Sequence, residues 1–127
     1  MENLRQVFGV FVAGGIGACL RVGLAALLDS RTARLPLGTL AVNLIGCLAI
    51  GFATMWLPRG PWRAIVLGGL LGGFTTYSSF ALLSVELLRA DRLGAAVAQI
   101  VLHVLGGVGA VLLGAWLGGA VLGSSPR

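Results

Sequence analysis

The residues best suited to hold a polar ligand lie in one stretch, residues 68–80, which reads GGLLGGFTTYSSF. Four glycines are followed by four serine and threonine hydroxyls, near the middle of a hydrophobic segment (65–88) that is long enough to cross a bilayer. Unwound backbone at that depth is tolerated only where it is buried in protein or lines a wet cavity. The pattern is therefore typical of a broken helix at an ion or substrate site.

Other polar side chains fall on stripes of the hydrophobic segments. Thr39, Asn43 and Cys47 are spaced four residues apart and so share one helix face. The amide of Asn43 offers two donors to an anion or a carbonyl to a cation, and its alternative role is a hydrogen bond between helices. Tyr77 and Phe80 also share a face. Their positive ring edges attract an anion weakly, although such pairs usually pack in a core.

Two titratable residues within the segments have alternative roles. His103 lies on a stripe with Gln99 and Gly107, where it either shuttles protons or acts as a neutral hydrogen-bonding group. Arg21 lies about one turn inside the end of the first segment. A charge there must snorkel, pair with a group such as Glu86, or face a water-filled vestibule.

The elements that position these residues must be membrane helices. The mean hydropathy is +1.00, 57% of the residues are hydrophobic and only 10% are charged, which excludes an ordinary soluble domain. We predict an all-α integral membrane protein with one domain over residues 1–127. Its four transmembrane helices span residues 7–28, 37–57, 62–88 (broken near 72–76) and 93–122.

The basic residues divide evenly between the two membrane faces. All nine are arginines, and apart from Arg21 four fall on each side. An excess on one side normally fixes orientation, so this balance favours either a chain that inserts both ways and pairs antiparallel or a small hidden bias. The net charge of +5 is spread over both faces and does not indicate nucleic-acid binding. One side carries Arg5, Arg59, Arg63 and Arg127, and the other Arg31, Arg34, Arg89 and Arg92.

Glycine is enriched, with 21 residues in 127, and much of it forms small-residue stripes four residues apart. Such stripes let helix backbones approach closely, within one chain or between chains. Their number favours a homo-oligomer. The spans contain no paired carboxylates, metal-ligand cluster or phosphate-binding loop, so we do not expect an enzyme. The first span also has no acidic residue, which argues against a small multidrug-resistance antiporter.

Three motifs together resemble the CrcB/Fluc family of fluoride channels over nearly the whole chain. They are residues 14–21 (GGIGACLR), residues 38–46 (GTLAVNLIG, followed by Gly51) and residues 72–80 (GGFTTYSSF). The resemblance implies an antiparallel, dual-topology dimer in the bacterial or archaeal inner membrane. Two pores would carry fluoride passively out of the cytoplasm. It also implies a structural sodium ion at the dimer interface, held by the backbone carbonyls of Gly72 and Thr75.

The resemblance further assigns the residues of the pore. Asn43 matches the family's pore asparagine, and Tyr77 and Phe80 match two pore-facing phenylalanines. His103 occupies a polar position of the fourth span that is usually a tyrosine. Thr39, Ser78 and Arg21 match positions near the aqueous vestibule. The departures at Tyr77 and His103 leave open a heterodimer with a diverged paralogue or a non-conducting subunit, and a transporter of another small solute remains the alternative function.

Overall fold

The computed structural model describes residues 2–29 and 37–123, which form helices and contain no strand. Four helical stretches are long and apolar enough to cross a membrane, which confirms the predicted all-α membrane fold. Arg31, Arg34 and Arg127 lie outside the described residues. The first two spans are α1 (Glu2–Leu28) and α2 (Leu37–Trp56). The third span consists of α3 (Pro61–Arg63), η1 (Ala64–Leu71), α4 (Gly72–Phe74) and α5 (Tyr77–Arg89). The fourth span consists of α6 (Leu93–Val101), η2 (Leu102–Gly106) and α7 (Gly107–Gly123).

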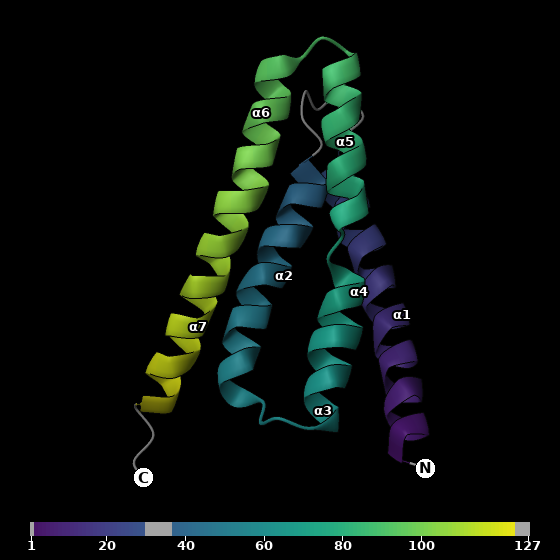
Figure 1. The fold of residues 1–127 in the computed structure, drawn as a ribbon, viewed down its shortest axis with the longest axis vertical. Coiled ribbons are helices and arrows are strands. Elements are labelled where there is room, and N and C mark those ends of the chain that lie inside the picture. Colours follow the sequence, from purple (N-terminus) through teal and green to yellow (C-terminus); the bar gives the residue numbers. More distant parts are fainter. Residues whose placement is uncertain (1, 30–36, 124–127) are drawn as a thin grey trace.

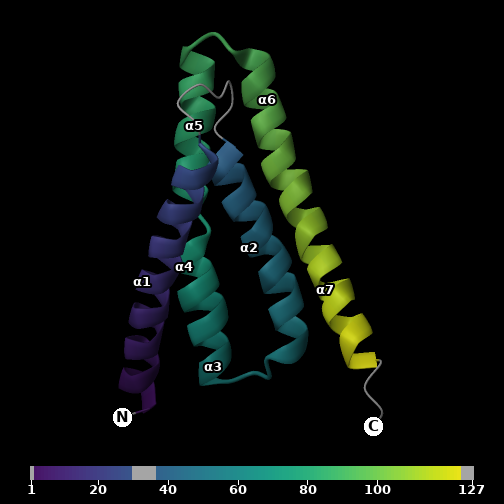
Figure 2. The same cartoon turned by 180° about the vertical axis from the view of Figure 1, so that it is seen from behind.

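The spans run up and down and form two closely packed pairs. α2 lies along α7, and α1 lies along η1 and α4 (Figure 1). The helices converge where α5 meets α6 and spread apart at the other end, as the view from behind also shows (Figure 2). The start of α1, the end of α7 and the connection between α2 and α3 all lie at the spread end.

Glycines allow the backbones of both pairs to touch. A Cβ atom on Gly114 of α7 would lie 2.9 Å from the amide nitrogen of Phe52 on α2. A Cβ atom on Gly73 of α4 would lie 2.9 Å from the Cα of Gly14 on α1. These small residues therefore serve packing within the chain.

Charged side chains near the membrane faces bond to the ends of α2. At its start, a carboxylate oxygen of Asp29 accepts a hydrogen bond from the amide of Gly38 at 2.7 Å. At its end, Nη1 of Arg63 donates to the carbonyl of Leu57 at 2.8 Å and to that of Thr54 at 3.3 Å. An anion at the N-terminus and a cation at the C-terminus of a helix both favour the helix dipole.

The predicted break in the third span is present and is two residues long. α4 ends at Phe74 and α5 begins at Tyr77, while Thr75 and Thr76 between them adopt extended backbone angles (ψ of 159° and 114°). Two π-helical stretches, η1 and η2, were not predicted. Both lie next to the groove described below, and π-turns within helices are frequent at functional sites.

Candidate functional site

Thr76 is the residue that restarts the helix after the break. Its hydroxyl oxygen accepts a hydrogen bond from the amide of Ser79 at 3.2 Å, which makes it the N-cap of α5. The same hydroxyl donates to the hydroxyl of Ser79 at 3.0 Å and lies 3.2 Å from that of Ser78. The hydroxyls that follow the glycines thus serve first to stabilise the new helix end.

Asn43 of α2 holds the backbone of the break. Its Oδ1 accepts from the amide of Thr76 at 2.8 Å, and its Nδ2 donates to the carbonyl of Thr76 at 2.9 Å. The first bond satisfies the amide of Thr76, which has lost its helical acceptor, and the second adds a donor to a carbonyl that already begins the hydrogen bonding of α5. One N–H of the Asn43 amide remains after these two bonds.

The break also removes the helical donors of several carbonyls, among them those of Gly72 and Thr75. In a continuous helix the carbonyl of Gly72 would accept from the amide of Thr76, and that of Thr75 from the amide of Ser79. Here those amides bond instead to Asn43 and to the Thr76 hydroxyl. The carbonyl of Thr75 accepts from Nη1 of Arg21 at 3.4 Å, so the partner of Arg21 is this backbone oxygen and not Glu86.

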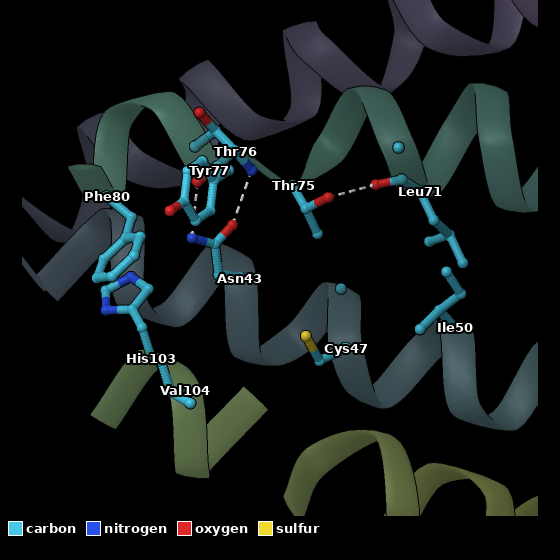
Figure 3. Close-up of a pocket in the computed structure, with 12 residues that line it drawn as sticks. Asn43, Cys47, Ile50, Leu71, Thr75, Thr76, Tyr77, Phe80, His103 and Val104 are labelled. Carbon is cyan, nitrogen blue, oxygen red and sulfur yellow. Dashed lines mark hydrogen bonds between the residues drawn. The ribbon is translucent and has the colours of Figure 1, made fainter. Parts of the chain in front are cut away.

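A groove of about 300 Å³ lies beside the break, between α2, the third span and η2 (Figure 3). Polar groups and aromatic rings line one end of it, and the other end is largely apolar. It contains no charged side chain among its lining residues. These are Asn43, Gly46, Cys47, Ile50, Leu71, Gly72, Thr75, Thr76, Tyr77, Phe80, His103 and Val104.

Three rings stand in a row at the polar end. Phe80 meets Tyr77 edge-on, with ring centroids 5.5 Å apart and planes 65° apart. On its other side Phe80 stacks on His103 at 4.4 Å and 27° (Figure 3). Tyr77 is 80% exposed in the single chain, so its ring is open for contact with a further molecule.

The structure brings most of the predicted site residues together. Gly72, Thr75, Asn43, Tyr77, Phe80 and His103 share the groove, whereas Thr39, Ser78 and Arg21 are not among its lining residues. The contribution of Thr76 was not predicted. Its position before an apolar helical segment is the signal of an N-cap that would have identified it. The apolar lining from Ile50, Leu71 and Val104 has no comparable signal.

Comparisons with known proteins give the family of this chain. The model of the family described as "CrcB-like protein, Camphor Resistance (CrcB)" matches residues 8–115. Proteins named fluoride-specific ion channel FluC from Dichelobacter nodosus, Erwinia tasmaniensis and Escherichia coli are 40%, 37% and 35% identical to this chain. Each alignment covers 90% of this chain and 97%, 95% and 94% of the respective relative. The chain is a multi-pass cell-membrane protein and belongs to the CrcB-like family.

Proposed function

We propose that this chain forms a fluoride-selective ion channel, through which fluoride leaves the cytoplasm passively. The chain is not an enzyme. The relatives whose sequences align with this chain over nearly their whole length are named fluoride-specific ion channel. The structural observation that carries the proposal is the groove beside the broken helix, where an amide and a row of aromatic rings meet at the depth of the membrane interior.

The lining suits a small, strongly hydrated anion. Fluoride that enters such a groove loses water, which donors and positive ring edges must replace. The remaining N–H of Asn43 and the edges of Tyr77 and Phe80 supply them. Thr39 and Ser78 add hydroxyls nearer the ends of the path, where Arg21 attracts anions. Because the amide of Asn43 and the ring edges are neutral, they bind the ion weakly enough for it to leave.

The pore is completed by a second copy in the opposite orientation. Few apolar side chains are buried within the described part of the chain, namely Val42, Leu87 and Ala96. The exposed ring of Tyr77 needs an opposite wall to enclose an ion. An antiparallel pair also accounts for the even distribution of arginines over the two faces. Each copy then contributes one groove, which gives two pores per dimer.

A sodium ion between the two copies suits the carbonyls of the break. Gly72 and Thr75 each present an oxygen that has lost its helical donor, and two copies together present four. Hard cations favour such oxygen ligands, and rings of backbone carbonyls bind alkali cations in channels. The carbonyl oxygen of Thr75 accepts one hydrogen bond, from Nη1 of Arg21 at 3.4 Å. The second lone pair of this oxygen remains for the ion.

The test is efflux of fluoride from liposomes that contain this chain alone, measured with a fluoride electrode. We expect fast fluoride efflux and no chloride efflux from matched liposomes. Dependence of the flux on a second gradient, such as a proton gradient, would indicate a coupled transporter instead. If well-folded protein gives no efflux, the chain needs a diverged partner subunit or carries another solute.

A further inference from the structure

His103 has one ring nitrogen bonded and the other buried without a partner. Nδ1 lies 2.9 Å from the backbone carbonyl of Gln99, one turn earlier on the fourth span. Nε2 is buried and has no hydrogen-bond partner among the described residues. Leaving a buried polar atom unpaired is costly in free energy. This nitrogen therefore indicates a site in the wall of the groove where a proton or a ligand binds.

The bond to Gln99 fixes which nitrogen carries the proton. A carbonyl oxygen only accepts, so Nδ1 must donate to it. In the neutral ring Nε2 is then a lone pair, which repels an anion. When the ring is protonated, Nε2 becomes a donor. Protonation thus converts this atom from an anion-repelling group to an anion-binding one.

The surroundings of His103 in the described part of the chain contain an aromatic face but no carboxylate that could pair with a protonated ring. The face of Phe80, stacked at 4.4 Å, attracts a cation through its π-system. No carboxylate lines the groove, and its other titratable groups are Cys47 of α2 and Tyr77 of α5. Neither α6 nor α7 contains a titratable residue.

Gln99 provides a second, independent sign of a polar ligand. Its side chain is only 4% exposed, and its Nε2 is buried without a hydrogen-bond partner. Gln99 and His103 are four residues apart, so they lie on one face of the fourth span. A small acceptor near this face would satisfy an unpaired amide donor.

We infer that His103 is a proton-binding site in the groove wall and that a small anion binds beside it together with that proton. The inference rests on the proposed function, in which the anion is fluoride. Nε2 takes its proton from the aqueous solution and forms an N–H bond, the anion accepts a hydrogen bond from this N–H, and no other covalent bond changes. Fluoride passage through this chain is therefore faster at low pH.

The first experiment measures fluoride efflux from liposomes at equal internal and external pH, with the leak of protein-free liposomes subtracted at each pH. We expect the rate to fall as the pH is raised, because the ring then loses the proton that donates to the anion. His103→Gln should make this profile flat. Cys47→Ala, which removes another titratable group of the groove, should keep the relative fall. A flat profile in the unaltered chain, or an unchanged fall in His103→Gln, would overturn the inference.

The second experiment separates this inference from the proposed function. His103 is the single histidine of the sequence, so ¹⁵N-histidine labelling of the chain without a histidine tag reports on it alone. At about pH 6.5, adding sodium fluoride should increase the protonated fraction of the ring, because proton and anion binding are reciprocally linked. Sodium chloride at the same concentration should not. Equal spectra in both salts would refute the site, whereas efflux without any fluoride-dependent protonation would leave only the channel function standing.

Discussion

Asn43 connects the sequence motif of the second span to the break in the third. Its two bonds to Thr76 hold the unwound backbone, and one N–H of its amide remains after them. We expect Asn43→Ala to leave the amide of Thr76 unpaired, at a cost of about 1–3 kcal/mol, and to abolish fluoride efflux. Efflux from liposomes and thermal unfolding in detergent measure the two effects. Thr39→Ala, one turn earlier outside the groove lining, is the control and should have a smaller effect on both. Normal efflux from Asn43→Ala would show that its amide is not part of the site.

Substitutions in the row of rings separate a need for the aromatic ring from a need for the phenol oxygen of Tyr77. Phe80 contacts both Tyr77 and His103, so Phe80→Ala removes the centre of the row. We expect fluoride efflux to fall by at least about tenfold, which corresponds to about 1.4 kcal/mol. Tyr77→Phe keeps the ring and should keep the efflux. Equal loss in both variants would mean that the phenol oxygen, and not the ring edge, matters at position 77.

At the scale of the helices, the closest backbone contact of α7 is made by Gly114. A Cβ atom there would also lie 3.0 Å from the carbonyl carbon of Leu48, with backbone that cannot move aside cheaply. We expect Gly114→Ala to destabilise the protein by about 1–3 kcal/mol through overpacking. Gly109→Ala, on the same helix with open space around its Cα, is the matched control. Unfolding by a denaturing detergent measures both, and similar stabilities would contradict this packing of α2 against α7.

The positions of the four spans could be predicted from the sequence better than the contacts between them and the irregular turns within them. Apolar composition is enough to predict four spans, and glycines followed by hydroxyls indicate a break because they weaken a helix and then cap a new one. The bonds between Asn43 and Thr76 depend on the register of residues 33 positions apart, which no local pattern reports. The stacking of His103 on Phe80 likewise needs two spans to meet. A π-turn adds one residue to a helical turn and leaves the apolar composition unchanged, so η1 and η2 gave no signal.

At the scale of the whole molecule, the proposed dual topology predicts the behaviour of single cysteines in loops. In a background of Cys19→Ser and Cys47→Ala, Pro58→Cys and Ala90→Cys place one thiol in each of two loops on opposite faces without changing the arginine balance. If the chain inserts both ways, an impermeant thiol reagent added outside should label about half of each variant, because the charge balance gives no preferred orientation. Complete labelling of one variant and none of the other would show a single orientation.

The proposed sodium site predicts a dependence of stability on this cation. A ligand that binds only the folded form stabilises it by about 2.7 kcal/mol at one hundred times its dissociation constant. We therefore expect the thermal midpoint of the purified protein to fall when choline chloride replaces sodium chloride. Potassium chloride at the same ionic strength controls for screening. Identical midpoints in all three salts would argue against a bound sodium ion between the copies.

The position of the two chain ends constrains how such a protein can be duplicated within one gene. α1 begins and α7 ends at the same side of the molecule, as an even number of spans requires (Figure 1). A direct tandem fusion would start the second copy on the side where the first one ended, and both halves would then point the same way. Two halves of opposite orientation in one polypeptide require an additional membrane-crossing segment between them. A single-gene version of the proposed pair therefore needs an odd number of spans.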